Sequence, residues 1–246
     1  MSRPLPPEIV DLVIDQLCDE PTTLRTCCLV SKSWVPRTRK HLFAHVKFDA
    51  ASHPLKSWVK VFPDPSKSPA HYTRSLSIPR LLGIPTGIRL RRWIRAFRNV
   101  VHFDFDFDYC PGYNPIIAPF RGFSPTVRSL RVTSNSFKVF DFICSFPFLE
   151  DLTLINIFSE GYGRGRTPSK SPKLTGSLAL SASGGISSAT RQLLDFPGGL
   201  HFTKITTWCI GGDLRSVTDL VSECSNTLES LHVYCFQLGA LRSTPL

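Results

Sequence analysis

A short apolar motif recurs along most of this chain, and its even spacing constrains the fold more than any other feature. Each copy alternates apolar and polar residues, as in Ser-Leu-Arg-Val from Ser129 or Asp-Leu-Thr-Leu from Asp151. Such alternation predicts a strand with one buried face. The first apolar residues of the eight copies are Val46, Leu76, Phe103, Leu130, Leu152, Leu178, Ile205 and Leu231, at successive intervals of 30, 27, 27, 22, 26, 27 and 26 residues. Because this kind of period is typical of repeat architectures, we expect one short strand in each of eight units.

The segments between these strands space their apolar residues differently, at i, i+3, i+4 and i+7. That spacing predicts a helix in each segment. The expected helical faces are Leu55, Trp58, Val59 and Phe62; Leu90, Trp93, Ile94 and Phe97; Phe137, Phe140, Ile143 and Cys144; Ile186, Ala189, Leu193 and Leu194; and Leu214, Val217, Leu220 and Val221. A unit of one strand and one helix leaves an apolar face open, so neighbouring units must stack.

This plan resembles the leucine-rich repeat in its longer, helix-bearing form. The resemblance predicts an α/β protein in which residues 45–246 form a right-handed solenoid. The repeats are degenerate, because Phe, Val and Ile replace many leucines and only Asn135 and Asn156 lie near the position of the usual asparagine. No helical segment follows the last strand, so we expect either an incomplete C-terminus or an exposed last edge.

Residues 1–44 have a different pattern, which predicts a separate domain of three short helices. Pro6 and Pro7 precede a first apolar stripe of Ile9, Val13 and Leu17, widened by Val10 and Ile14. Proline is tolerated in the first turn of a helix, where its missing N–H has no partner to lose. Asp19-Glu20-Pro21 ends this helix, and the expected caps of the next two are Thr22 or Thr23 and Ser31 or Ser33, with Pro36 in the first turn of the third.

The order of residues in this segment resembles an F-box, as found in fungal F-box-like proteins. The matching residues are Leu5-Pro6, Glu8-Ile9, Leu12, Leu17, Leu29-Val30-Ser31 and Trp34. The resemblance implies that the segment binds the Skp-type adaptor of an SCF-type ubiquitin ligase, and through it the cullin and RING subunits. The residues expected to contact the adaptor are Leu5, Pro6, Ile9, Leu12, Leu17, Leu29, Val30 and Trp34.

An F-box followed by leucine-rich repeats implies a non-enzymatic subunit that recruits a protein substrate for ubiquitin-dependent degradation. The alternative is a leucine-rich-repeat scaffold whose first three helices only cap the solenoid. The two hypotheses differ in the surface of the first helix. A cap buries Ile9 and Val13 against residues 45–62, whereas an adaptor-binding domain leaves apolar surface open.

The polar residues of the strands predict where a substrate would bind. In a strand the repeated apolar residues point into the core, and the residues between them face the opposite, concave side. Trp208 and Tyr234 favour binding over an idle solvated face, because exposed aromatic residues are common at binding hot spots. The candidate substrate-binding residues are His102, Asp104, Asp106, Arg131, Asp151, Lys204, Trp208, His232 and Tyr234.

Composition and motifs argue against several other functions. The net charge of +10 suits an acidic partner, but the basic residues are spread along the chain without a nucleic-acid-binding motif. Asp104, Asp106 and Asp108 lack the Gly and distal Glu of a calcium loop, so we expect no metal and no other cofactor. No catalytic motif is present.

The sequence also predicts a compartment. We find no secretory signal and no apolar run of about 20 residues, which favours the cytoplasm or nucleus. The eight cysteines contain no C-x-x-C pair and are expected to be small, reduced, buried residues. Residues 161–173 predict a basic loop, in which phosphorylation at Thr167 or Ser171 would reverse the local charge.

Overall fold

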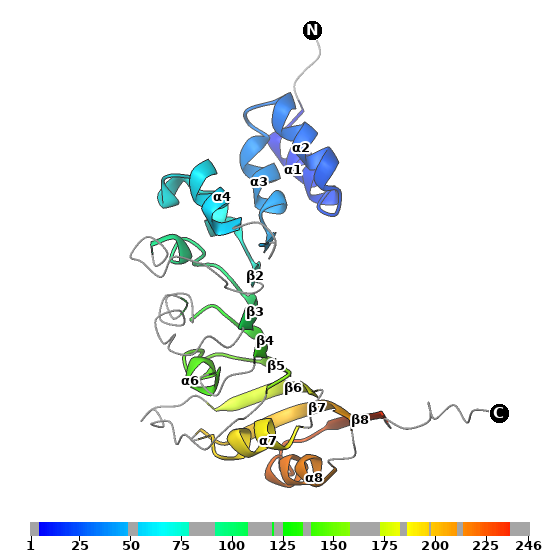
Figure 1. Ribbon diagram of the computed structural model, residues 1–246. Coiled ribbons are helices and arrows are strands. Elements are labelled where there is room, and N and C mark those ends of the chain that lie inside the picture. The colour runs from blue at the N-terminus through cyan, green and yellow to red at the C-terminus, as the bar shows by residue number, and fades with distance from the viewer. Residues whose placement is uncertain are drawn as a thin grey trace, which may run out of the picture.

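Three helices precede a parallel sheet in the computed structural model of this chain (Figure 1). The structure describes residues 5–48, 54–78, 92–107, 120, 125–134, 139–157, 173–182, 186–196, 198–210 and 214–236. The helices are α1 (Pro7–Gln16), α2 (Pro21–Val30), α3 (Val35–Leu42), α4 (Pro54–Val61), α6 (Val139–Ile143), α7 (Ser187–Leu194) and α8 (Leu214–Glu223), with 3₁₀ turns η1 (Pro65–Lys67) and η2 (Pro69–Tyr72). The strands are β1 (His45–Lys47), β2 (Ser75–Ile78), β3 (His102–Phe107), β4 (Ser129–Ser134), β5 (Asp151–Ile155), β6 (Leu174–Ala182), β7 (Leu200–Ile210) and β8 (Ser230–Phe236).

The eight strands form one parallel sheet in sequence order, from β1 to β8. All eight predicted strands are therefore confirmed. Their register is also the one that the motif implies, because Val46 pairs with Leu76, Leu76 with Phe103, and so on through Ile205 to Leu231. The strands line the inner side of an arc, and α4 and α6 lie on its outer side (Figure 1). This α/β arrangement is consistent with leucine-rich-repeat-like units.

The alternation of the motif decides which side of the sheet is buried. From β1 to β7 the first apolar residue of each motif is buried, and the second is buried in every strand from β2 to β6. In β8 the corresponding residues Leu231 and Val233 are 44% and 37% exposed. Among the described residues β8 has a strand neighbour on one side only, so its core side has no further unit to cover it.

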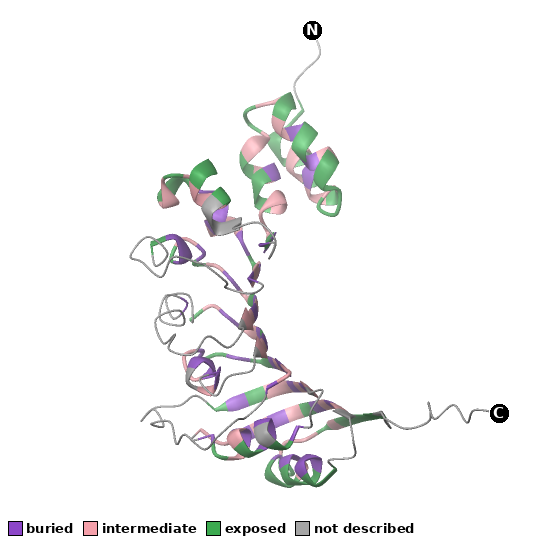
Figure 2. Ribbon diagram, viewed as in Figure 1, coloured by how far each residue is buried: buried purple, intermediate pink, exposed green. Residues whose placement is uncertain are grey.

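Phenylalanine rings form much of the core between the sheet and the helices. Phe103, Phe105, Phe120, Phe142 and Phe146 are each at most 1% exposed, and their rings contact one another at centroid distances from 4.8 to 6.5 Å. Such ring pairs add about 0.5–1.5 kcal/mol beyond the area that they bury. The buried residues of this core form one cluster that extends from Val46 to Cys224, and Figure 2 shows buried positions on both the strands and the helices.

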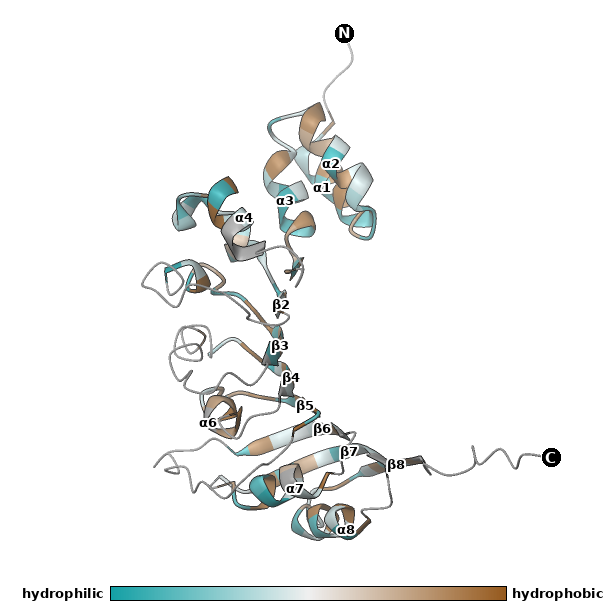
Figure 3. Ribbon diagram, in the orientation of Figure 1, coloured by the Kyte–Doolittle hydropathy of each residue, from teal (hydrophilic) through white to brown (hydrophobic). Residues whose placement is uncertain are grey.

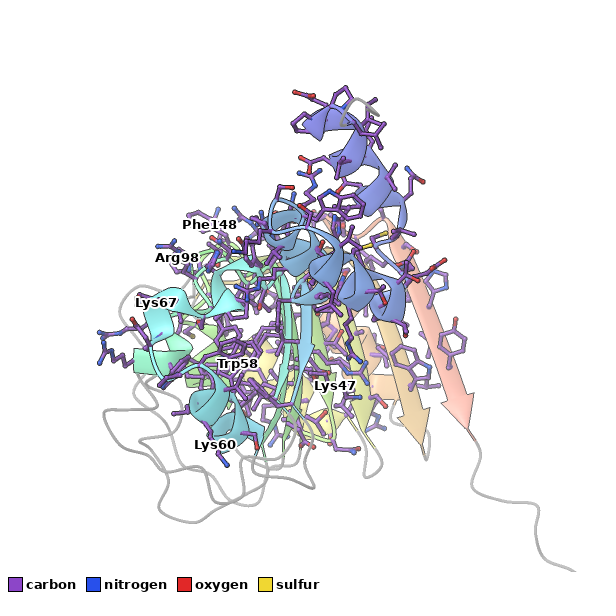
Figure 4. All side chains as sticks on the ribbon, turned by 90° about the horizontal axis from the view of Figure 1, so that it is seen from above. Lys47, Trp58, Lys60, Lys67, Arg98 and Phe148 are labelled. Carbon is purple, nitrogen blue, oxygen red and sulfur yellow. The ribbon has the colours of Figure 1, made fainter. Side chains whose placement is uncertain are left out.

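A second group of rings connects α4 to the first strands. Trp58 of α4 contacts Phe43, Phe48, Phe62 and Phe97 at centroid distances of 4.9 to 5.9 Å. Figure 4 shows Trp58 pointing into the space between α4 and the sheet, while Lys60 and Lys67 point outwards. This ring group fixes the first unit of the sheet against its helix.

Backbone hydrogen bonds join neighbouring units at the entry to β3, β4 and β5. The Arg74 carbonyl accepts the N–H groups of Val101 and His102, at 2.8 and 2.9 Å, and the Val101 carbonyl accepts those of Arg128 and Ser129. The Arg128 carbonyl accepts two more N–H groups, from Glu150 and Asp151. At each of these three entries one carbonyl satisfies two backbone donors. Asn156 has a left-handed φ of 51°, and Asn135 lies outside the described residues.

One irregularity interrupts the pairing of β6 with β7. Gly176 pairs with Phe202 and Ser177 with Lys204, so Thr203 is an extra residue in β7. Gly176 has a left-handed φ of 76°, and a Cβ there would lie 1.9 Å from the carbonyl oxygen of Glu150. Only glycine fits at this approach of β6 to β5.

The helices follow the predicted segments, although the buried faces of two of them differ from the prediction. In the segment predicted from Leu90 to Phe97, residues 92–94 are helical, Trp93, Ile94 and Phe97 are buried as predicted, and Arg92, Arg95 and Arg98 are exposed. In α6 the buried face includes Val139 and Phe142 and not Phe140, which is half-buried. Leu214 of α8 is exposed, because it begins the helix beyond the face that Val217 and Leu220 bury.

The predicted helix caps were also wrong. The caps of α2 and α3 are Glu20 and Trp34, and neither makes a side-chain capping hydrogen bond. Thr23 donates to Glu20 instead, and Ser33 bonds to Ser31. Pro36 does fall in the first turn of α3 as predicted, where a proline is tolerated.

Two of the cysteines differ from the expected burial. Cys27 and Cys224 are buried, whereas Cys18 and Cys235 are exposed. Cys18 follows the end of α1, and Cys235 lies on the uncovered core side of β8, so neither has a layer above it in the described structure. None of the described helices combines the length and the apolar character that crossing a membrane requires.

Candidate interaction surfaces

The first three helices form a small unit with few buried side chains. Ile14 of α1, Leu24 and Cys27 of α2, and Thr38 of α3 are its buried residues. Thr38 donates from its hydroxyl to the carbonyl of Trp34 at 2.7 Å, which satisfies its polar group inside the helix. A core of this size leaves most apolar side chains of the unit outside it.

An ionic cluster joins α1 to α3. The Arg37 guanidinium donates to both carboxylate oxygens of Asp15, and His41 Nε2 lies 2.7 Å from Asp15 Oδ1. The hydrogen bonds from Arg37 and His41 hold the pKa of Asp15 well below its usual range. Arg37 also lies 4.0 Å from Asp11. The cluster therefore fixes the angle between the two helices with charge-assisted bonds.

Sequence analysis missed this cluster, although the sequence contained a signal for it. Asp11 and Asp15 are four residues apart, and so are Arg37 and His41. Residues at that spacing share one face of a helix. Two acidic residues on one helix and two basic ones on another indicate a contact between the two faces. Which faces meet, however, depends on the tertiary packing.

The apolar side chains left outside this small core define the first candidate surface. Of the twelve large hydrophobic side chains that are exposed among the described residues, six lie between residues 5 and 30. We call them the helical apolar set: Leu5, Ile9, Leu12, Val13, Leu29 and Val30. Leu29 is the most exposed, at 87%, and Figure 3 shows apolar segments on α1 and α2. Exposed apolar residues concentrated in this way indicate a binding surface.

The eight residues predicted to bind the adaptor divide into two groups in the structure. Leu5, Pro6, Ile9, Leu12, Leu29 and Val30 are exposed, as free contact residues would be. Leu17 and Trp34 are half-buried, and Leu17 is the C-cap residue that directly follows α1. Leu17 and Trp34 therefore contribute partly to the unit's own packing.

The three-helix unit touches the sheet through α3. The contact is between α3 and η2, the 3₁₀ turn that precedes β2 in the chain. Ile9 and Val13 of α1 are not part of it, and they remain 44% and 51% exposed. The side of α1 that points into the unit carries Ile14, with Val10 half-buried. The apolar stripe of α1 is thus wider than the part that the chain itself covers.

The inner face of the sheet is the second candidate surface. It consists of the strand residues that alternate with the buried ones, and all nine predicted substrate-binding residues belong to it. His102, Arg131, Asp151, Lys204, His232 and Tyr234 are exposed, and Asp104, Asp106 and Trp208 are half-buried. The strand register brings Asp104 next to Arg131, Trp208 next to Tyr234, and Lys204 next to Ser230.

Hydrogen bonds between neighbouring strands orient several of these polar side chains. Ser77 donates to Asp104 at 3.3 Å, and Ser177 donates to Asp151. Within β8, Ser230 and His232 are hydrogen-bonded at 3.0 Å. The inner face therefore presents oriented carboxylates on β3 and β5, and an oriented imidazole on β8.

An aromatic pair stands at the β8 end of the inner face. The rings of Trp208 and Tyr234 are stacked, with centroids 5.7 Å apart and an interplanar angle of 10°. Tyr234 is 47% exposed. The sequence predicted both as exposed aromatics, which is confirmed for Tyr234 and wrong for Trp208, since Trp208 is half-buried. The stacking follows from their paired positions in the register.

Among the described residues no group of three His, Cys, Asp or Glu side chains could hold a metal ion. Asp108, and the predicted phosphorylation sites Thr167 and Ser171, lie outside the described residues. No protein-family model matches the sequence, and no curated protein matches it.

Proposed function

We propose that this chain is a non-enzymatic, substrate-recruiting subunit of an SCF-type ubiquitin ligase. Residues 1–44 would be an F-box that binds a Skp-type adaptor, and the sheet and helices that follow would be a right-handed leucine-rich-repeat solenoid. The mechanism is proximity, because the solenoid holds a protein substrate near the ubiquitin-loaded subunit while the helices hold the ligase. Such a subunit works in the cytoplasm or nucleus.

The observation that carries the proposal is the exposure of the helical apolar set. Burying an apolar side chain such as leucine stabilises a protein by about 1.5–3 kcal/mol, so leaving six of them in water needs a reason. A partner that covers α1 and the end of α2 supplies one. Five of the six, all except Val13, are also residues by which the segment resembles an F-box.

The exposure of α1 also weighs against the capping alternative. A cap for the first repeat would bury Ile9 and Val13 against residues 45–62, as a terminal unit normally shields its neighbour. Both side chains are about half-exposed, and the contact with the sheet runs through α3 and η2 instead. Binding of a separate partner accounts for this geometry better than capping does.

The inner face supports the substrate-binding half of the proposal. It presents charged groups of both signs and a stacked aromatic pair with an exposed tyrosine on the sheet, which suits recognition of a protein surface. An oriented side chain loses less conformational freedom on binding than a free one. The inter-strand bonds of Asp104 and Asp151 therefore favour recognition.

The test is co-expression of the whole chain with the Skp-type adaptor of its source organism, followed by co-purification. Leu29 is the best site for a perturbation, because at 87% exposure its replacement leaves the packing of α2 unchanged. We expect Leu29→Glu to weaken adaptor binding at least about tenfold, since it places a charge in an apolar interface.

Leu214→Glu provides a matched control. Leu214 is also an exposed leucine on a helix, but it begins α8 at the far end of the sheet. The control variant should co-purify with the adaptor like the wild type. Equal binding by wild type and Leu29→Glu would refute the assigned surface, and absence of binding by a folded wild-type chain would refute the proposed function.

A further inference from the structure

The stacked pair of Trp208 and Tyr234 is the most distinctive chemical feature of the inner face. We propose that the inner face of β7 and β8 binds an extended protein segment that carries an aromatic or proline ring and, about four residues away, an acidic side chain. This inference names the chemistry of the partner. It rests on the proposed function only in calling that partner a substrate.

The aromatic pair is ready to receive a ring before any partner arrives. Its rings already lie parallel, 10° apart in plane, on neighbouring strands of a continuous sheet. Aromatic side chains give large contact areas at a low cost in conformational entropy, and stacking of two rings lowers that cost further. A ring on the partner can extend the stack or lie across its edges.

The neighbouring side chains leave room beside the pair. The register partner of Trp208 on β6 is Ser181, whose side chain ends at a hydroxyl, and the next residue in that row is Ile155 of β5. The indole is therefore bordered by Tyr234 on one side and by a short side chain on the other. A flat ring is the group that such surroundings accept best.

Lys204 gives the β7 and β8 end of the inner face a positive charge. Lys204 of β7 and the imidazole of His232 on β8 are exposed there, and none of the described inner-face residues of β6, β7 and β8 is acidic. The acidic residues of this face, Asp104, Asp106 and Asp151, lie on β3 and β5. Charge complementarity therefore favours an acidic group over the β7 and β8 end.

The spacing of Lys204 and Trp208 sets the distance between ring and acid. The two residues are four apart on one strand, or about 13 Å at 3.3 Å per residue. A partner segment in an extended conformation, aligned with the strand, has the same rise per residue. Its acidic side chain would therefore lie about four positions from its ring.

The same face argues for a protein partner in preference to single-stranded nucleic acid. Rings and basic residues also bind nucleic acid, but such sites follow the phosphate backbone with a groove of positive charge. Here the exposed cation on the strand of the indole is Lys204, and Asp151 lies two strands from Lys204. A phosphate backbone running across the inner face would meet that carboxylate and those of β3.

A displayed library of random short peptides, panned against the full-length chain, tests the inference. We expect the enriched peptides to combine a ring with Asp or Glu three to five positions away. A resynthesised peptide should bind Trp208→Ala at least about tenfold more weakly, as expected for an aromatic hot spot. Lys204→Glu should weaken peptide binding severalfold. Changing the acidic residue of the peptide to lysine should restore binding to the Lys204→Glu variant.

Arg215→Glu is the matched control for Lys204→Glu. It makes the same change of charge at an exposed residue, but on α8, outside the inner face. Its affinity for the peptide should stay within about twofold of the wild type, since the two sites are independent. Far-UV circular dichroism and thermal unfolding would establish that each variant is folded.

Three results of the peptide experiments would overturn the inference, and a competition result would be a fourth. The three are enrichment of no peptide, enrichment of peptides without the ring and acid, and unchanged binding by Trp208→Ala. Single-stranded RNA that displaced the bound peptide and bound more tightly would overturn it in favour of nucleic acid. Loss of adaptor co-purification, with peptide binding intact, would count against the proposed function and leave this inference standing.

Discussion

Gly176→Ala provides the sharpest test of how the repeats approach one another. An alanine Cβ at this position would lie 1.9 Å from the Glu150 carbonyl oxygen and 2.8 Å from its carbon, both backbone atoms of β5's entry segment. Backbone cannot rotate away as a side chain can, so β5 and β6 would have to separate. That separation would break the hydrogen bond from the Ser177 N–H to the Glu150 carbonyl, now 2.8 Å long.

Two effects set the size of the loss. A residue with a side chain in the left-handed region costs about 1–2 kcal/mol, and a buried backbone group left without its partner costs about 1–3 kcal/mol. We therefore expect Gly176→Ala to lower the free energy of unfolding by about 2–5 kcal/mol, a large part of a typical stability of about 5–15 kcal/mol. Urea unfolding followed by circular dichroism measures it.

Gly199→Ala separates the clash from the backbone strain. Gly199 has nearly the same φ, 73° against 76°, but the nearest atom to its added Cβ is His201 Nε2 at 3.5 Å, an ordinary contact. The control should lose only the conformational part, about 1–2 kcal/mol. If both variants lost the same amount, the close approach of β6 to Glu150 would not be what requires glycine at position 176.

Two further predictions concern the helical unit and the core. Asp15→Asn should destabilise the chain at neutral pH. Because the pKa of Asp15 is lowered in the folded state, its contribution is fully present above the ordinary aspartate value of about 3.9 and is lost as pH falls below it. The difference in unfolding free energy between wild type and Asp15→Asn should therefore shrink as pH falls below about 4, and a constant difference would contradict the role of the ionic cluster. Phe103→Ala should cost about 3–5 kcal/mol of unfolding free energy, because it empties a buried ring site. Phe148→Ala, at a ring 52% exposed that contacts Arg128, should cost less than about 1 kcal/mol, and similar losses at the two sites would contradict the assigned core.

The strands and their register could be predicted from the sequence because the same apolar motif occurs eight times. One position of the motif, represented by Leu76, Phe103 and Leu130, recurs at nearly constant intervals, and a parallel stack places such positions side by side. Any single short apolar run would have been ambiguous between strand and helix. Eight copies removed the ambiguity.

Features set by packing between elements could not be predicted in the same way. The stripe of α1 includes both Ile9 and Ile14, and only the position of α3 decides that Ile14 is buried. The same holds for α6, where Phe142 rather than Phe140 enters the core. Helix caps at Thr22 or Ser33 failed because the backbone at Glu20 and Trp34 begins each helix one or two residues away.

The candidate site was predicted in part for the same reasons. Strand alternation alone predicts which residues lie on the inner face, so all nine candidate residues were correctly assigned to that face. The stacking of Trp208 on Tyr234 required the register of β7 with β8, and the Asp15 cluster required a contact between helices far apart in sequence. Exposure of Leu29 became visible only in the structure.

The affinity of the purified full-length chain for the purified Skp-type adaptor is the most direct test of the central claim. Isothermal titration calorimetry measures it without a tag or a surface. The exposed apolar residues of α1 and α2 predict saturable binding with a dissociation constant below about 1 µM and a negative heat-capacity change, as apolar burial requires. A folded chain that releases no heat and shows no saturation with the adaptor would contradict the account.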